Sequence, residues 1–309
     1  MEYRRLGKSG LKVSEIGLGT NNLGGRTDEQ TSINIISHAL ELGVNFIDTA
    51  ELYTRGRSEE IVGKAVKRKR SQVIIATKFG YPGAVGPDQQ RASRNYIMRA
   101  VDASLRRLNT DYIDLYYVHY PESETPIQET LRALDDLVRD GKVRYIGCSN
   151  FDAWQICEAL WTSQYNNRES FITVQSRYNL LDRSIERELV PCCQTYGVGV
   201  IPWGPLASGF LTGKYRRSQK IAARAPLASP IYRDFLTDTN FDRIAKLKIF
   251  AKERGHNIGE LAIAWLLSHP WLGSVIAGAT SVEQLSLNAT AASWKLTEED
   301  AAQLGNILQ

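Results

Sequence analysis

The chain has 309 residues, of which 43% are hydrophobic and 23% are charged, and its formal net charge is +4. This composition is typical of a globular protein with a large core, and the length fits one α/β barrel domain over residues 1–309. The mild charge, without a recognition helix, argues against a nucleic-acid partner. No apolar stretch reaches the roughly 20 residues of a membrane span, and no signal peptide is evident, so we expect a cytoplasmic protein without a membrane partner.

The chain opens with a short hairpin and then alternates strands with helices. Two extended runs around a Gly-bounded turn predict the hairpin at Tyr3–Ser14. Short apolar runs predict eight strands at Ile16–Thr20, Val44–Ile47, Val73–Lys78, Tyr112–Val118, Arg144–Cys148, Phe171–Val174, Gly197–Pro202 and Ser274–Ile276. Helices are predicted at Thr27–Leu42, Ser58–Val66, Ser93–Leu108, Pro126–Arg139, Ala153–Trp161, Ile185–Tyr196, Phe241–Arg254, Gly259–Ser268, Val282–Ala291 and Thr297–Leu308. The irregular stretch Gly204–Thr239 predicts a long loop after the seventh strand.

Short strands without alternating polarity, interleaved with helices, indicate a parallel sheet that is covered on its outer face. Eight such units predict an α/β fold of the (β/α)8 TIM-barrel type, with an N-terminal β-hairpin and a long loop after strand seven. An open doubly wound sheet is the alternative, and it predicts a Gly-x-Gly-x-x-Gly turn after the first strand. The turn Gly17–Asn22 lacks the third glycine. The barrel is therefore preferred.

Polar residues recur where the apolar strands end, which is where a barrel of this kind builds its active site. Asp48, Lys78 and His119 end the neighbouring second, third and fourth strands, and Tyr53 lies on the loop after Asp48. A buried carboxylate is costly without a partner, so we expect Asp48 to form an ion pair with Lys78. Taken singly, each residue also has a purely structural explanation, such as a histidine in the core.

This group of side chains indicates general acid–base chemistry at a carbonyl. A lysine ammonium beside Tyr53 favours the phenolate, so we expect the pKa of Tyr53 to lie below its free value of about 10. Such a tyrosine can donate a proton to a carbonyl oxygen while His119 orients the carbonyl. No serine or cysteine stands with a base as a nucleophile would. We predict no metal site, because no metal-ligand spacing relates the cysteines, which we interpret as reduced and structural: Cys148, Cys157, Cys192 and Cys193.

Two loops have the composition of a phosphate-binding site. The segment Trp203–Lys214 offers glycines for close backbone approach and a lysine for phosphate. The turn Gly278–Ser281 precedes a helix whose N-terminal amides can bind an anion. Gly209 and Gly213 would let the long loop fold over a bound cofactor.

Several motifs occur together in a familiar order: Gly43–Ala50, Ser58–Gly63, Ala76–Lys78, Ser104–Leu108, Asp111–His119, Gly147–Phe151, Gln175 and Trp203–Tyr215. Over essentially its whole length the chain resembles the aldo-keto reductases. The resemblance implies a barrel that binds NADPH at the strand C-termini and transfers a hydride to an aldehyde or ketone, or in reverse oxidises an alcohol. The family's catalytic tetrad falls on Asp48, Tyr53, Lys78 and His119, with Tyr53 as the proton donor.

The same resemblance assigns cofactor contacts to strand ends and loops: Thr20, Asn21, Asp48, Ser149, Asn150, Gln175, Trp203, Gly204, Pro205, Leu206, Gly209, Leu211, Lys214, Gly278, Thr280, Ser281, Gln284 and Asn288. The chain departs from the family pattern at Gly204, Ala277 and Leu287, where Ser, Pro and Glu are usual. The segment 278–288 has no lysine or arginine for the 2′-phosphate of NADPH, so NADH is the alternative cofactor. The long loop offers other cations: Lys214, Arg216, Arg217 and Arg224.

Two other classes of function are compatible with these residues. One is a cofactor-binding regulatory or redox-sensing subunit, like the potassium-channel β subunits that share this fold. The other is a lyase or isomerase that uses Lys78 as a Schiff base. The accompanying Asp48, Tyr53 and His119 argue against this alternative. We expect the pocket walls to come from residues 22–27, 81–91 and 120–125 and from the stretch after Gly213. Tyr81 in the second of these segments favours an apolar or aromatic pocket. No feature of the sequence indicates an oligomeric state.

Overall fold

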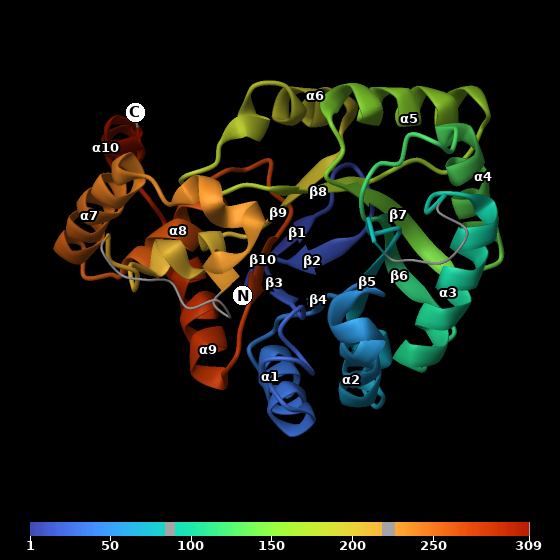
Figure 1. Ribbon diagram of the computed structural model, residues 1–309, viewed down its shortest axis with the longest axis horizontal. Helices are drawn as coiled ribbons and strands as arrows, with labels where there is room; N and C mark the ends of the chain where they lie inside the picture. The colour runs from blue at the N-terminus through green and yellow to red at the C-terminus, as the bar shows by residue number, and fades with distance from the viewer. Residues whose placement is uncertain (84–89, 218–225, 309) are drawn as a thin grey trace.

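Short buried strands and longer helices alternate along the chain and assemble into a barrel (Figure 1). The computed structural model describes residues 1–83, 90–217 and 226–308. Eight parallel strands lie in the order β10-β3-β4-β5-β6-β7-β8-β9. Their bounds are β3 (Ile16–Gly19), β4 (Phe46–Asp48), β5 (Ile74–Phe79), β6 (Ile113–Val118), β7 (Val143–Ser149), β8 (Thr173–Arg177), β9 (Gly199–Trp203) and β10 (Val275–Gly278).

The two ends of this strand order meet through the segment that precedes β10. Val200 in β9 forms a parallel bridge with Leu272. The backbone N–H of Gly273 donates to the carbonyl oxygen of Val200 at 3.0 Å. The ring of strands is therefore nearly closed, which confirms the predicted (β/α)8 barrel and excludes the open doubly wound sheet.

Helices surround the ring, and each helix predicted from the sequence is present with shifted ends. Their bounds are α1 (Glu29–Glu41), α2 (Arg57–Val66), α3 (Arg94–Leu108), α4 (Ile127–Arg139), α5 (Ala153–Tyr165), α6 (Leu189–Tyr196), α7 (Asp238–Glu253), α8 (Ile258–Leu267), α9 (Val282–Thr290) and α10 (Glu298–Leu308). The helix predicted to start at Ile185 instead begins at Leu189 after a 3-10 turn, η3 (Ser184–Glu186). Pro191 explains this, because proline is tolerated in the first turn of a helix but not in its interior.

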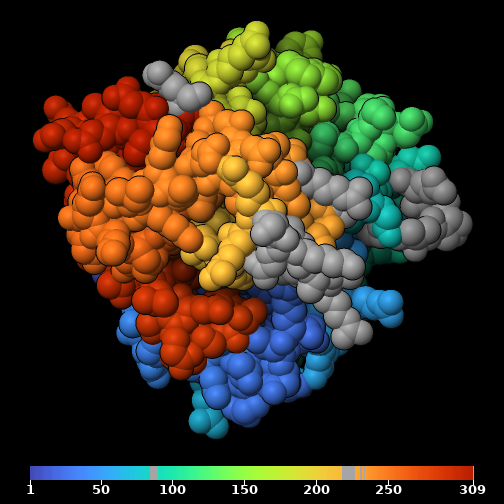
Figure 2. Space-filling view, turned by 60° about the vertical axis from the view of Figure 1, so that its left-hand side comes forward, coloured from blue at the N-terminus to red at the C-terminus, as the bar shows by residue number. Residues whose placement is uncertain are grey.

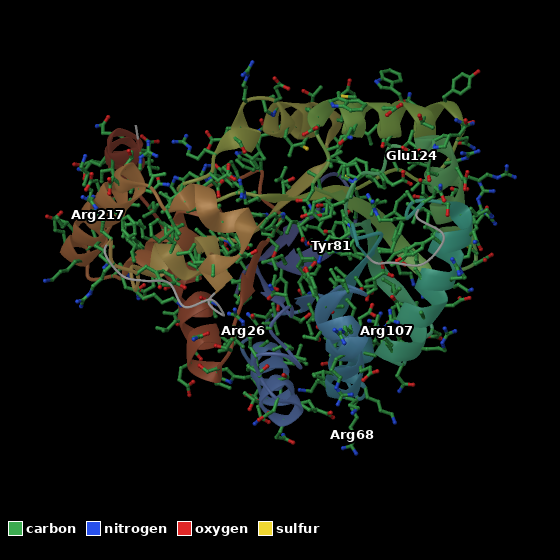
Figure 3. All side chains as sticks on the ribbon, in the orientation of Figure 1. Arg26, Arg68, Tyr81, Arg107, Glu124 and Arg217 are labelled. Atoms are coloured by element: carbon green, nitrogen blue, oxygen red, sulfur yellow. The ribbon has the colours of Figure 1, made fainter. Side chains whose placement is uncertain are left out.

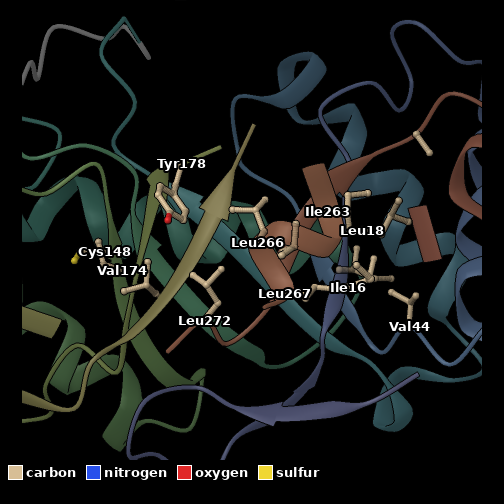
Figure 4. Packing of buried hydrophobic residues seen from close by; sticks show 14 of the residues in the cluster. Ile16, Leu18, Val44, Cys148, Val174, Tyr178, Ile263, Leu266, Leu267 and Leu272 are labelled. Carbon is tan, nitrogen blue, oxygen red and sulfur yellow. The ribbon is translucent and has the colours of Figure 1, made fainter. Parts of the chain in front are cut away.

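Two layers of apolar side chains hold the barrel together. The outer core packs the helices onto the strands, and Figure 4 shows part of it, with Leu18 of β3 and Ile263 of α8 among its members. The inner core fills the ring itself and includes Phe46, Leu115 and Leu6. Leu6 comes from the predicted N-terminal hairpin, β1 (Tyr3–Arg5) and β2 (Lys12–Ser14), which pairs antiparallel and lies within the outline of the ring in Figure 1. The hairpin therefore plugs the barrel.

The long loop after β9 contains short 3-10 turns: η4 (Ala207–Thr212), η5 (Pro226–Ala228) and η6 (Pro230–Phe235). Figure 2 shows its yellow part at the surface, next to orange residues that follow it in the chain. Arg224, and residues 84–89 of the expected pocket wall, lie outside the described residues. No helix in the described ranges is both long enough and apolar enough to cross a membrane.

Candidate active site

The two-residue repeat of the strands carries the candidate catalytic side chains to the inside of the ring. In β4, Phe46 belongs to the inner core, and Asp48 follows two residues later as the last residue of the strand. In β5 the same spacing relates Ala76 to Lys78. His119 directly follows β6. Because these strands are neighbours in the sheet, the three ionisable side chains meet at one end of the barrel.

Asp48 and Lys78 form a buried ion pair. Lys78 Nζ donates to Asp48 Oδ1 at 2.5 Å and to the carbonyl oxygen of Thr49 at 2.9 Å, and 0% of the Lys78 side chain is exposed. Burial by itself lowers the pKa of Lys78, but the Asp48 carboxylate and the Tyr53 phenol outweigh that effect, and the net pKa is raised. Lys78 therefore stays an ammonium rather than a nucleophilic amine, which argues against the Schiff-base alternative.

The second oxygen of the Asp48 carboxylate is also hydrogen-bonded. Gln175 Nε2 donates to Asp48 Oδ2 at 2.8 Å. Gln175 lies inside β8, which continues to Arg177, and not at the strand end where the sequence places it. The resemblance assigns Gln175 to a bound cofactor, and the structure shows that its amide also fixes the orientation of Asp48.

Tyr53 lies beside the ion pair at the start of η1 (Tyr53–Gly56). Lys78 Nζ donates to the Tyr53 hydroxyl at 3.3 Å. The expected lowering of the Tyr53 pKa is wrong: burial of the phenol raises its pKa more than Lys78 lowers it, and the Asp48 charge raises it further. Tyr53 therefore carries its proton at neutral pH, as a proton donor must.

The turn that follows Tyr53 is left-handed. Thr54, Arg55 and Gly56 have φ angles of 49°, 58° and 87°, a conformation that costs free energy for residues other than glycine. Thr54 Oγ1 donates to the carbonyl oxygen of Leu23 at 3.1 Å. This contact ties the turn, and with it Tyr53, to the loop after β3.

His119 lies against the ring of Tyr53 in an edge-on arrangement, with 6.1 Å between ring centroids. Burial and the nearby Lys78 ammonium hold the pKa of His119 well below its usual value. Within the described part of the chain, its Nδ1 atom is buried and has no hydrogen-bond partner. His119 is therefore a neutral imidazole that can orient a carbonyl through a hydrogen bond.

These side chains open onto a cavity of about 690 Å³ at the C-terminal ends of the strands. Three of the predicted site residues do not line it: Lys78 is buried and donates to the Tyr53 hydroxyl, Leu211 is buried in the outer core, and Ser281 caps α9 by accepting from the Gln284 N–H at 3.3 Å. All other predicted site residues line it: Thr20, Asn21, Asp48, Tyr53, His119, Ser149, Asn150, Gln175, Trp203, Gly204, Pro205, Leu206, Gly209, Lys214, Gly278, Thr280, Gln284 and Asn288.

Asn150 links three strand ends at the cavity wall. Its Nδ2 donates to the carbonyl oxygen of His119 and to Ser149 Oγ, each at 3.0 Å. Its Oδ1 accepts from Trp203 Nε1 at 3.0 Å. The side chain predicted to hold a cofactor therefore also positions His119 and Trp203.

Sequence reasoning missed several lining residues. Tyr120 stacks on His119 with 5.5 Å between centroids, and Tyr232 reaches the cavity from η6 in the long loop. Arg26 lies between α1 and α9, as Figure 3 shows. Tyr81, which the sequence already suggested as an aromatic pocket residue, lies over the ring. Tyr120 and Arg26 stand in loops already expected to form walls, whereas the α8 residues carry no sequence signal because that helix precedes the last strand: Asn257, Gly259, Glu260 and Ile263.

The cavity suits an elongated ligand with phosphate groups. Gly204 has a φ of 67°, and a Cβ there would meet no atom within 4 Å, so the backbone faces open space. A Cβ on Gly209 would lie 2.9 Å from Lys214 Nζ, which means that glycine lets this cation approach the loop. Lys214 and Arg26 both line the cavity and supply positive charge. The residues present therefore fit a dinucleotide cofactor that extends from the ion pair toward α9.

Comparison with known proteins agrees with this arrangement. The model of the aldo/keto reductase family matches residues 15–309. The chain belongs to the aldo/keto reductase family. The chain is therefore an NAD(P)H-dependent oxidoreductase that acts on carbonyl compounds.

The relatives of this aldo/keto reductase have different names. A probable voltage-gated potassium channel subunit beta of Oryza sativa subsp. japonica is 38% identical, over 94% of this chain and 91% of the relative. The versiconal hemiacetal acetate reductase of Aspergillus parasiticus is 36% identical, over 98% of this chain and 96% of the relative. The aldo-keto reductase YhdN of Bacillus subtilis (strain 168) is 35% identical, over 100% of this chain and 94% of the relative. Enzymes and a channel subunit thus share this sequence family.

Proposed function

We propose that this aldo/keto reductase uses NADPH to reduce an aldehyde or ketone, and that Tyr53 donates the proton. One observation carries the proposal. Tyr53 lines the cavity, and its hydroxyl accepts a hydrogen bond from Lys78 at 3.3 Å, while Asp48 holds the same lysine at 2.5 Å.

Each residue of the tetrad has a distinct task in this proposal. The bound cofactor supplies a hydride to the carbonyl carbon. Tyr53 donates its proton to the carbonyl oxygen as negative charge develops there. The Lys78 ammonium stabilises the phenolate that remains, and Asp48 keeps that ammonium in place. His119 is neutral, so it can hydrogen-bond to the carbonyl oxygen without competing as an acid.

We assign the cofactor to the loops at the end of the barrel. The backbone at Gly204 and Gly209, together with Lys214, would hold the diphosphate. Gln284 and Asn288 of α9 would hold the adenosine. NADPH is favoured over NADH because Lys214 and Arg26 line the cavity, although segment 278–288 offers no cation.

Arg217 of the long loop contributes less to this preference. Arg217 forms ion pairs with Asp238 at 3.1 Å and with Asp242, both in α7. Its charge is therefore engaged on the outer surface of the molecule.

We also propose that residues 1–309 work as one domain in the cytoplasm and act on apolar or aromatic carbonyl compounds. The four free cysteines support a reducing compartment. The rings of Tyr81, Tyr120 and Tyr232 line the cavity around His119 and support an apolar substrate.

The proposal is tested by mixing the purified protein with NADPH or NADH and a panel of aldehydes, ketones and alcohols. We expect oxidation of NADPH that depends on an aromatic aldehyde or ketone, and a lower Kd for NADPH than for NADH. Turnover of no carbonyl compound by a protein that binds the cofactor would contradict the proposal.

A second candidate function is a cofactor-binding regulatory or redox-sensing subunit with slow reductase activity. The 38% identity to a probable potassium channel subunit beta favours it. Cofactor binding with turnover that remains slow on every substrate of the panel would support this candidate over the first.

A further inference from the structure

All four cysteines of the chain gather on one side of the barrel, between β7, α5 and α6. Cys148 is in β7, Cys157 in α5, and Cys192 and Cys193 in α6. Burial and the neighbouring thiols raise the pKa of Cys148 and of Cys193. Cys148 and Cys193 are 0% exposed and pack in the outer core, where a thiol behaves as a small apolar side chain.

The other two cysteines form a close pair that solvent can reach. Cys157 Sγ lies 3.5 Å from Cys192 Sγ, and both residues are partly exposed. Their helices, α5 and α6, lie next to each other along one edge of the molecule in Figure 1. A disulfide requires about 2.05 Å between sulfur atoms, so small side-chain rotations on two neighbouring helices would bring these sulfurs to bonding distance.

We propose that Cys157 and Cys192 are an oxidation site, at which a hydroperoxide converts the two thiols into a reversible disulfide that joins α5 to α6. The pair lies outside the catalytic cavity. The inference does not rest on the proposed carbonyl reduction.

The chemistry balances in two steps. Cys157 attacks the hydroperoxide, the O–O bond breaks, and Cys157 becomes a sulfenic acid while water or an alcohol leaves. Cys192 then attacks the Cys157 sulfur, an S–S bond forms, the S–O bond breaks and water leaves. Over both steps each thiol loses one electron, the two peroxide oxygens gain these two electrons, and both thiol protons end in the released water or alcohol. A dithiol reductant reverses the oxidation by exchange.

Either thiol of the pair can react first, and the disulfide formed is the same, because the two sulfurs lie 3.5 Å apart. The thiolate is the nucleophilic form, and burial and the neighbouring Cys157 raise the pKa of Cys192. Once Cys157 is a sulfenic acid, Cys192 is the nearest thiol to it.

The bridge would also tie α5 to α6 close to the start of α5. In the reduced protein the Cys192 thiol donates to the carbonyl oxygen of Ala153 at 3.6 Å, and the covalent bond to Cys157 would replace this contact. Ala153 is the first residue of α5 and follows shortly after Asn150, which links three strand ends. A bridge between helices restricts the unfolded chain, so the oxidised protein should unfold at a higher temperature than the reduced one.

The test treats the reduced full-length protein with hydrogen peroxide, alkylates the remaining thiols under denaturing conditions and maps the peptides by mass spectrometry. We expect two of the four thiols to escape alkylation, a Cys157–Cys192 linked peptide, and a rise in Tm of several degrees, all reversed by dithiothreitol. Cys157→Ser should lose the linked peptide and the Tm shift. Cys193→Ala should keep both.

Several results would overturn the proposal, and none of them depends on enzyme activity. They are four alkylated thiols after peroxide treatment, a bridge that contains Cys193, or sulfinic acid at Cys157 with no bridge. The wild-type peptide map decides between them even if a variant folds poorly. A Tm shift that persists in Cys157→Ser would also contradict it.

Discussion

Burial acts on three ionisable residues of the site and leaves each in a different state. It raises the pKa of Tyr53, which keeps its proton. It lowers the pKa of His119, which stays neutral. Only Lys78 stays charged, because the Asp48 carboxylate raises its pKa. At neutral pH the site therefore holds an ammonium, a phenol and a neutral imidazole, which is the set that proton donation from Tyr53 requires.

Replacing the Asp48 carboxylate should leave the Lys78 charge buried without its counter-ion. We expect Asp48→Asn to lower the free energy of unfolding by about 3–5 kcal/mol, measured by urea denaturation. Asp102→Asn is the matched control, because Asp102 pairs with Lys142 at 2.8 Å on the surface and should cost below about 1 kcal/mol. Equal losses in the two variants would contradict the account.

The depressed pKa of His119 predicts a loss of stability in acid. Between the lowered folded pKa and the unfolded value near 6.5, the unfolded chain binds one more proton than the folded chain. The free energy of unfolding should therefore fall by up to about 1.4 kcal/mol for each pH unit below about 6.5. Urea denaturation at neutral and acidic pH should show a shallower decline for His119→Gln. Parallel declines would show that His119 does not titrate in this way.

At the scale of elements, the sequence predicts which residues end the strands, but it does not predict the hydrogen bonds that connect those strand ends. A buried parallel strand is an apolar run, so Asp48, Lys78 and His119 stood out where the runs end. The hydrogen bond from Gln175 to Asp48 joins residues 127 positions apart, and no local pattern predicts it. The predicted direction of the Tyr53 pKa shift was wrong for the same reason, because the burial of the phenol depends on the whole fold.

The loop after β9 gives a prediction about a single glycine. Gly209 has a φ of 86°, and a Cβ there would press on Lys214 Nζ at 2.9 Å. We expect Gly209→Ala to raise the Kd for NADPH about tenfold or more, a loss of roughly 1.4 kcal/mol in binding free energy, measured by fluorescence titration.

Gly141→Ala is the matched control for this variant. Gly141 follows α4, has a φ of 74°, and a Cβ there would meet nothing within 4 Å. It should show a similar backbone strain with an unchanged Kd. An unchanged Kd for NADPH in Gly209→Ala would show that this loop does not contribute to cofactor binding.

At the scale of the whole molecule, the two ends of the barrel have different roles: one end stabilises the fold and the other carries the candidate active site. The hairpin β1–β2 plugs one end of the ring, and the cavity occupies the end where the strands terminate. In barrels of this kind the two faces carry different roles. Changes in the plug should therefore affect folding without altering the site.

Leu6 tests this separation. It is 0% exposed and belongs to the inner core with Phe46 and Leu115. We expect Leu6→Ala to lower the free energy of unfolding by about 2–5 kcal/mol, while kcat/KM per folded molecule stays at the wild-type value. A large loss of kcat/KM in protein that remains folded would show that the two ends are coupled.

The central claim is that Tyr53 donates the proton, and kcat of Tyr53→Phe tests it most directly. We expect kcat for carbonyl reduction to fall by about 10²–10⁴-fold while the Kd for the cofactor stays within a few-fold of wild type. Tyr178→Phe is the control, because it removes another buried hydroxyl, one bonded to Glu186 at 2.6 Å, and should retain turnover. Turnover by Tyr53→Phe at the wild-type rate would contradict the account.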